Sequence, residues 1–115
     1  MPTPSRFLAE FELLVMLALL RQPNAAYGAS IRREIEDRTN RPVSIGAVYA
    51  TLGRLEDKGM LTSRVSDPLP FKGGRSRKLY ALTPAGRRAV QHSAGAFTRM
   101  MDGVDLSAGT NRGGG

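Results

Sequence analysis

The amino-acid sequence predicts a mainly α-helical domain of the α+β class, with three helices, a two-stranded hairpin and a final helix. Apolar residues recur at helical spacing in four segments, residues 7–20, 25–39, 44–58 and 83–104. Two short segments, residues 61–65 and 78–82, instead alternate with a period of two, and a loop rich in glycine and proline joins them. A chain of 115 residues is long enough for one domain with a single modest core.

The composition excludes several classes of site. The chain has no cysteine and a single histidine, so we expect no disulfide, no metal site, no cofactor and no thiol nucleophile. The longest apolar run, residues 13–20, is far too short to span a membrane, and acidic residues interrupt the N-terminal segment where a signal peptide would be apolar. We therefore expect a cytoplasmic protein with no membrane association.

Positive charge is concentrated in one quarter of the chain. The net charge is +7, and the segment 64–88 holds seven basic side chains against one acid. Residues 1–60, in contrast, are almost balanced, with eight basic and seven acidic side chains. A block this asymmetric favours contact with a polyanion, and nucleic acid is the first candidate partner of a basic cytoplasmic domain.

The first helix, predicted over residues 7–20, is apolar on nearly every side, so it has to be covered on two sides. The remaining helices of the domain or a partner subunit would supply that cover, and the sequence leaves both open. In the second helix, over residues 25–39, Tyr27, Ile31 and Ile35 form one apolar stripe. Its outer face carries mixed charges typical of a solvated surface, and Asn40 can adopt the left-handed conformation that ends a helix.

The third helix has an unusual outward face. Ser44 is a good N-cap, Gly59 a good terminator, and four apolar side chains share the inner face: Ile45, Val48, Leu52 and Leu55. The opposite face carries Arg54 and four very small residues: Gly46, Ala47, Ala50 and Gly53. Each glycine weakens a helix by about 1 kcal/mol relative to alanine, so two of them need a reason. Close approach to a DNA groove is one reason, and tight packing on another helix is the alternative.

The hairpin projects a basic loop, and the last helix carries an apolar seam. The loop and its edges supply Lys72, Arg75, Arg77 and Lys78. Thr83 and Pro84 are suited to the cap and first position of the last helix, and its apolar residues follow coiled-coil spacing: Val90, Ala94, Phe97, Met101 and Val104. Two heptads are too short to be stable alone, so the seam has to pack on something. We expect the tail, residues 105–115, to be disordered.

This order of elements is that of a winged helix-turn-helix, over residues 7–82, followed by a helix over residues 83–104. The second and third helices form the reading pair, and the hairpin forms the wing. The N-terminus of the third helix, at Ser44, favours phosphate, while its small residues allow a close approach to duplex DNA. The wing cations would contact the backbone or the minor groove.

Three blocks of residues, in order, resemble the PadR-type transcriptional regulators of the small subtype. The first is Tyr27-Gly28, which opens the second helix, and the second runs from Ser44 to Leu61 and contains Tyr49, Arg54, Leu55, Glu56 and Gly59. The third runs from Gly73 to Gly86 and is similar to the pattern Gly-Arg-x-Arg-Lys-x-Tyr-x-Leu-Thr-x-x-Gly. The resemblance extends over about residues 7–104.

The resemblance implies a homodimeric DNA-binding regulator, usually a repressor, on a near-palindromic operator. By motif position, Tyr49 and Arg54 of the third helix and Arg75, Arg77 and Lys78 of the wing would contact DNA, whereas Tyr80 belongs to the core. The last helix of each subunit would pack on the partner's first and last helices, which implies an interface through eight residues: Phe7, Phe11, Leu14, Val90, Ala94, Phe97, Met101 and Val104.

Two departures from the family pattern matter. Ala47-Val48-Tyr49-Ala50 stands where Thr-Leu-Tyr-Pro is common, so a hydroxyl contact at position 47 is absent. Some small members bind flat aromatic drugs between tryptophans at the dimer interface, but this chain has no tryptophan. The sequence leaves open whether a small apolar effector binds at Phe97, Met100 and Met101. A winged-helix adaptor that binds an acidic protein is the alternative function. The sequence shows no nucleophile–base pair, metal cluster or phosphate loop, so we expect no catalytic residues and no enzyme.

Overall fold

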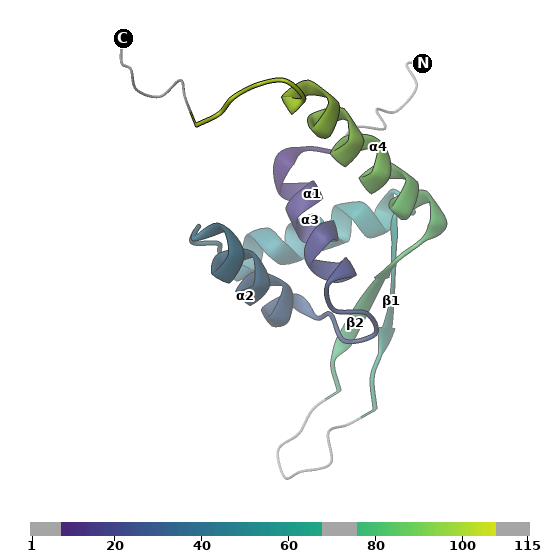
Figure 1. Cartoon of the computed structure of the whole chain (residues 1–115). Coiled ribbons are helices and arrows are strands. Elements are labelled where there is room, and N and C mark those ends of the chain that lie inside the picture. The colour runs from purple at the N-terminus through teal and green to yellow at the C-terminus, as the bar shows by residue number, and fades with distance from the viewer. Residues whose placement is uncertain (1–7, 68–75, 108–115) are drawn as a thin grey trace.

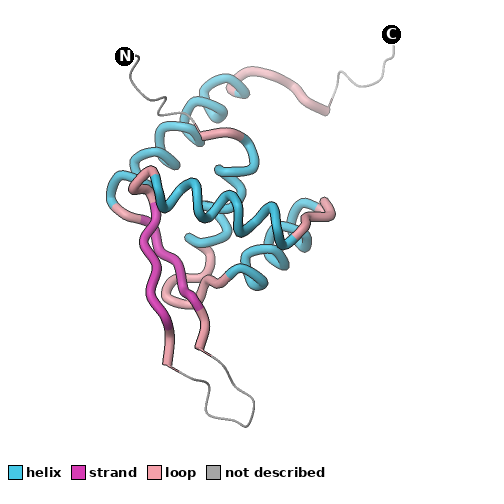
Figure 2. The backbone as a smooth tube through the Cα atoms, turned by 180° about the vertical axis from the view of Figure 1, so that it is seen from behind, coloured by secondary structure: helices cyan, strands magenta, loops and turns pink. Residues whose placement is uncertain are grey.

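The computed structural model describes residues 8–67 and 76–107. Their elements follow in the order α1 (Glu10–Leu20), α2 (Gly28–Thr39), α3 (Ile45–Asp57), β1 (Leu61–Val65), β2 (Lys78–Leu82) and α4 (Pro84–Met101). The three N-terminal helices form the body of the molecule, the hairpin extends away from it at one end, and α4 lies across α1 at the other end (Figures 1 and 2). The predicted mainly α winged helix-turn-helix is confirmed.

Local capping explains where the helices begin. Ser44 accepts a hydrogen bond from the Ala47 N–H at 3.1 Å, and Thr83 accepts one from the Gly86 N–H at 3.0 Å, so both predicted caps are confirmed. The first two helices begin three residues later than predicted. Residues 9 and 27 both have extended backbones, and the N–H of each donates to a side chain three positions on, that of Glu12 or Ser30.

Left-handed residues end α2 and α3 as predicted, whereas α4 ends at Met101, three residues before the predicted end at residue 104. Asn40 follows α2 with φ of 59°, and Gly59 follows the α3 cap with φ of 76°. The two strands occupy the predicted residues and pair antiparallel, with Leu61 opposite Leu82 and Ser63 opposite Tyr80. This register directs Leu61 and Tyr80 into the core.

One apolar core holds the helices and the base of the hairpin together. Its most deeply buried side chains come from all three N-terminal helices: Val15, Met16, Ile31, Val48, Leu52 and Leu55. Tyr80 is also buried, as predicted. The start of α4 packs so closely on the backbone of Met60 that a Cβ at Gly86 would overlap the Met60 carbonyl oxygen. The requirement for glycine at position 86 therefore comes from the junction between α4 and β1.

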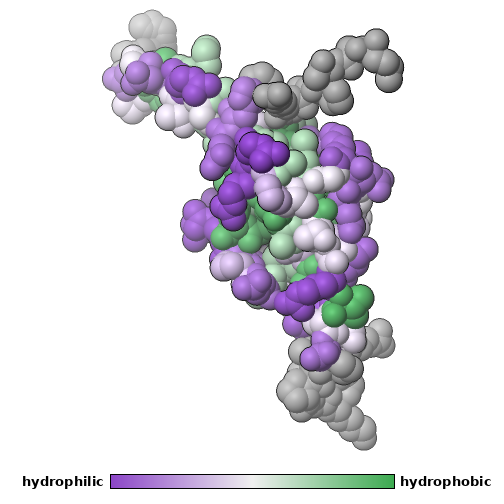
Figure 3. Space-filling model, turned by 90° about the vertical axis from the view of Figure 1, so that its right-hand side faces the viewer, coloured by the Kyte–Doolittle hydropathy of each residue, from purple (hydrophilic) through white to green (hydrophobic). Residues whose placement is uncertain are grey.

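The two halves of α4 have different surroundings. Ala89, Val90 and Ser93 are buried against the body, and the Ser93 hydroxyl accepts a buried hydrogen bond from the Leu8 N–H at 2.9 Å. Beyond this point the helix projects from the body (Figures 1 and 3). Phe97 is 54% exposed and Met101 49% exposed. The first half of α4 thus belongs to the core, and the second half leaves its apolar side chains uncovered within the described chain.

Candidate nucleic-acid interface

The outward face of α3 is bare, as the sequence predicts. Val48, Leu52 and Leu55 are buried on the inner face, and four small residues on the outer face are exposed: Gly46, Ala47, Ala50 and Gly53. We call these four the small-residue face. A Cβ built at either glycine would meet nothing within 4 Å. No packing within the described chain therefore requires glycine at these two positions. Packing on another helix of the same chain is thus not the reason for the small residues.

Tyr49 joins α3 to the start of α2. Its side chain is about half exposed, at 51%, and its ring lies where a Cβ of Gly28 would be. Position 28 therefore has to be glycine if the ring keeps this place. The exposed part of Tyr49 borders the small-residue face, on the same helix as the exposed cap residue Ser44.

The described part of the wing carries three exposed cations, Arg64, Arg77 and Lys78. The Arg77 guanidinium carbon lies 4.2 Å from the centroid of the Tyr27 ring. The Lys78 ammonium lies 3.8 Å from a Glu56 carboxylate oxygen and 5.7 Å from the Tyr80 ring centroid. Lys78 is thus partly neutralised within its own subunit, whereas Arg64 and Arg77 have no carboxylate partner in the described chain. Lys72 and Arg75, which the sequence also assigns to DNA binding, lie outside the described residues.

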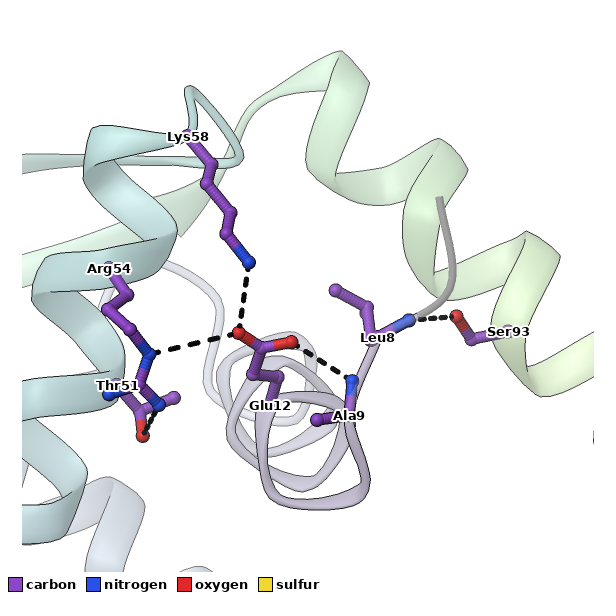
Figure 4. Close-up of polar contacts among 7 residues, drawn as sticks. All are labelled: Leu8, Ala9, Glu12, Thr51, Arg54, Lys58 and Ser93. Atoms are coloured by element: carbon purple, nitrogen blue, oxygen red, sulfur yellow. Dashed lines mark hydrogen bonds and ion pairs between the residues drawn. The ribbon is translucent and has the colours of Figure 1, made fainter. Parts of the chain in front are cut away.

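Arg54 lies toward α1 rather than straight outward, as Figure 4 shows. Its Nη2 donates to the Thr51 hydroxyl at 3.0 Å, and its Nε lies 4.0 Å from Glu12. Lys58 lies 3.3 Å from the same carboxylate, and the Ala9 N–H donates to the other oxygen at 3.0 Å. Glu12 therefore holds both cations at the C-terminal end of α3.

Sequence reasoning missed the role of Glu12. Its side chain is only 9% exposed, although both of its cationic partners are about half exposed. One signal was present, since Glu12 is one of two acids in a helix whose other residues are all apolar. Carboxylates are rarely buried without a partner. The identity of its partners was not available from spacing, because they lie more than forty positions away in the chain.

Tyr27 and Arg33 were also missed as surface features of the site. The Arg33 Nη2 donates to the Tyr27 hydroxyl at 3.5 Å, and this bond is the largest cause of a lowered pKa at Tyr27. The Tyr80 phenol shows the opposite shift, because burial raises its pKa. The two tyrosines thus have different surroundings, since one faces cations at the surface and the other lies in the core.

The residues predicted at the subunit interface differ in how far their own subunit covers them. Val90 is 5% exposed and packs in the core of its own subunit, because the first half of α4 lies against α1. Phe11 and Leu14 are half-buried against the same core, and Ala94 is also half-buried. Phe97, Met101 and Val104 are exposed, and Met100 and Leu106 extend the apolar surface. Phe7 lies outside the described residues.

Other kinds of site find no support in the described ranges. Residues 8–67 and 76–107 contain no group of three or more side chains suited to hold a metal ion. None of the helices in these ranges has the length and hydropathy needed to cross a bilayer.

Comparison with known proteins agrees with this geometry. A family model described as "Transcriptional regulator PadR-like family" matches residues 16–92. The chain is 39% identical, over 79 residues, to the transcriptional regulator Rv3488 of Mycobacterium tuberculosis, and the match covers 67% of each chain.

Two solved structures have the same arrangement of elements. A PadR family transcriptional regulator from Eggerthella lenta is 29% identical, with a TM-score of 0.65, and the match covers 89% of this chain and 88% of that one. A PadR-like transcriptional regulator from Bacillus cereus shares the fold at 16% identity, with a TM-score of 0.70 over 88% of this chain and 93% of that one. Because the family model matches well over half of its residues, the chain belongs to the PadR-like family of transcriptional regulators, and it is a DNA-binding regulator rather than an enzyme.

Proposed function

We propose that the chain acts in the cytoplasm as a homodimeric repressor, with α3 of each subunit in the major groove of a near-palindromic operator. The observation that carries the proposal is the exposed small-residue face of α3, which nothing within the described chain requires. A helix fits into the major groove when its outward side chains are short enough for the backbone to approach. Ser44 caps the helix that holds Tyr49. Arg77 and Lys78 lie where the paired strands lead into the connecting loop, with Lys78 3.8 Å from Glu56 of α3.

The proposed DNA contacts divide into two kinds. Gly46, Ala47 and Ala50 would set how deeply α3 enters the groove, while Tyr49 would reach a base edge or the sugar. Arg77 and Lys78 would contact phosphates, together with Lys72 and Arg75 of the connecting loop. Arg54 is bound to Glu12 and Thr51, so it would contribute to the electrostatic field at the end of α3 rather than read a base.

A substitution on the small-residue face tests this placement. Ala50→Glu puts a long acidic side chain on the exposed face with little cost to the helix, because glutamate is a good helix former. We expect it to abolish a mobility shift that the unchanged protein gives with DNA fragments from around its own gene. Ala85→Glu, at an exposed position in the first turn of α4, is the matched control and should keep the shift. If the two variants bound DNA equally well, α3 would not be part of the DNA interface.

The dimer is proposed from the projecting half of α4. Phe97 and Met101 on α4 and Val104 just beyond its end are each about half exposed, and apolar side chains in this position are costly to leave in water. A second copy of the helix, together with the half-buried Phe11, Leu14 and Ala94, would cover them. Light scattering after size exclusion should give twice the chain mass for the unchanged protein and the chain mass for Phe97→Asp. Arg99→Asp, on the opposite face of the same helix, should remain dimeric.

The mode of regulation and the effector need separate tests. In a reconstituted transcription assay, a repressor should reduce transcript from an operator-bearing template but not from one with the operator scrambled. If a small apolar effector binds between subunits at Phe97, Met100 and Met101, flat aromatic compounds should raise the melting temperature of the dimer. Met100→Ser should weaken that response, and a response that Met100→Ser leaves unchanged would place the effector elsewhere.

A further inference from the structure

Two arginines from different elements converge on the phenol of Tyr27. Arg77, just before β2, stacks over the ring with its guanidinium carbon 4.2 Å from the centroid. Arg33, in the second turn of α2, donates from Nη2 to the hydroxyl at 3.5 Å. Tyr27 itself is the extended residue that caps α2. We call Arg33 and Arg77 the arginine pair.

No aspartate or glutamate side chain forms an ion pair with either member of the arginine pair. All ten acidic residues lie in the described ranges, and none comes within 4.0 Å of the side-chain nitrogens of Arg33 or Arg77. Six other cations do have a carboxylate partner at that distance: Arg32, Arg38, Arg41, Arg54, Lys58 and Lys78. Two positive charges are thus brought together on one neutral ring, an arrangement that favours an anion from outside the chain.

The way in which Tyr27 holds the two guanidiniums leaves their donors available. The Arg77 guanidinium meets the ring through a cation–π contact, and a guanidinium has five N–H donors with which to bind an anion. Arg33 commits a single nitrogen to the hydroxyl. The charges also act on Tyr27. The Arg33 hydrogen bond is the largest influence and lowers the pKa of its phenol, burial opposes this, and the Arg77 charge lowers the pKa further.

The arginine pair lies next to the proposed DNA surface. The Ala26 carbonyl accepts a hydrogen bond from the Tyr80 N–H at 2.9 Å, which fixes the segment before α2 against β2. On the other side, the ring of Tyr49 occupies the space above Gly28. The start of α2 therefore lies between the exposed tyrosine of α3 and the base of the wing. A DNA backbone that touches both would pass the arginine pair.

We propose that Arg33 and Arg77 bind a phosphate of the duplex backbone together, and that Tyr27 is the positioning residue that orients both. The proposal rests on the proposed function and extends the DNA surface to α2, whose outer face the sequence assigned to solvent. Guanidinium forks match phosphate oxygens in geometry and charge, and orienting them in advance reduces the entropy lost on binding.

The test compares two glutamine substitutions on the same helix. Arg33→Gln removes a cation of the pair, while Arg38→Gln removes a cation that Glu34 already neutralises. Binding of the full chain to a fluorescein-labelled duplex of mixed sequence is followed by anisotropy between about 50 and 200 mM salt. Arg33→Gln should weaken binding by about five- to tenfold at the lowest salt and flatten the slope of log K against log salt by about one unit. Arg38→Gln should keep both values.

Tyr27→Phe tests the positioning role. It keeps the ring under Arg77 but removes the hydroxyl that accepts from Arg33. We expect it to weaken binding less than Arg33→Gln, and we expect Arg33→Gln to have a smaller effect in the Tyr27→Phe background than in the unchanged protein. A purely structural role would lower the melting temperature and leave the salt slope unchanged, which would overturn the proposal.

Two further outcomes are separable. If the unchanged protein binds the duplex and Arg33→Gln matches Arg38→Gln in affinity and slope, phosphate binding by the arginine pair is wrong while the proposed function stands. If the unchanged protein binds no duplex even at the lowest salt, the proposed function fails, and phosphate binding by the arginine pair fails with it. Exchange of chloride for inorganic phosphate at equal ionic strength should preserve the difference between the variants, and its disappearance would assign the pair to a free anion instead.

Discussion

Glu12→Gln should destabilise the fold far more than the same change two residues earlier. The Glu12 carboxylate is nearly buried, accepts the Ala9 N–H, and contacts Lys58 at 3.3 Å and Arg54 at 4.0 Å. Glutamine fills the same volume, but its NH₂ group is a donor that would face two cations. The loss combines a charge-assisted hydrogen bond to the backbone with two ion pairs whose cations are about half exposed.

The expected magnitude follows from these contacts. A hydrogen bond to a charged group contributes about 1.5–3 kcal/mol, and each ion pair with a solvated cation adds at most about 1 kcal/mol. Because the glutamine oxygen can still accept from Ala9, we expect the free energy of unfolding to fall by about 2 kcal/mol. For a domain of this size, that lowers the melting temperature by roughly 8–16 °C. Urea unfolding followed by circular dichroism, at fixed protein concentration, measures the change in the free energy of unfolding.

Glu10→Gln is the matched control. Glu10 lies on the same helix and forms an ion pair with Arg41 at 3.1 Å, but its side chain is 74% exposed. Its loss should change the free energy of unfolding by no more than about 0.5 kcal/mol. Equal stability of the two variants would refute the reasoning, because it would mean that burial of the Glu12 carboxylate contributes nothing.

Three glycines give further predictions that melting curves and DNA binding can check. Gly86→Ala should cost more than about 2 kcal/mol, because the new Cβ would overlap the backbone carbonyl of Met60. Gly95→Ala should be neutral or stabilising by up to about 1 kcal/mol, since its Cβ would approach only the end of the Arg99 side chain, at 3.2 Å. A loss of stability as large as that expected at position 86 would contradict this. Gly53→Ala should also stabilise the helix, yet weaken DNA binding if α3 enters the groove; unchanged binding would show that this turn stays clear of DNA.

Local signals were sufficient to predict most of the elements. The strands were predicted residue for residue, because alternation and the flanking turn residues act over a few positions. The caps at Ser44 and Thr83 were also correct, since a capping side chain and its partner are three residues apart. Both early helices were predicted three residues too long at the start, because the residues before an extended cap resemble helix in composition.

What the sequence could not predict concerns contacts between elements. Spacing placed Val90 in one apolar seam with Phe97 and Met101, but spacing along a helix does not tell where the subunit's own core ends. Arg54 was placed on the outward face, and its wheel position does not reveal that Glu12 draws its side chain toward α1. Arg33 is exposed, as predicted, but its contact with Tyr27 was not predicted, because the two residues lie six positions apart across a helix start.

The division of α4 into a buried half and an exposed half has a consequence for any protein that covers its end. The buried Leu8–Ser93 bond and the surrounding core fix the helix before a partner arrives. A free amphipathic segment would have to fold as it bound, and would lose much of its gain to ordering. Here the helix is already formed as far as Met101, so association mainly restricts side chains, and the few exposed apolar residues from Phe97 to Met101 can suffice for a lasting contact.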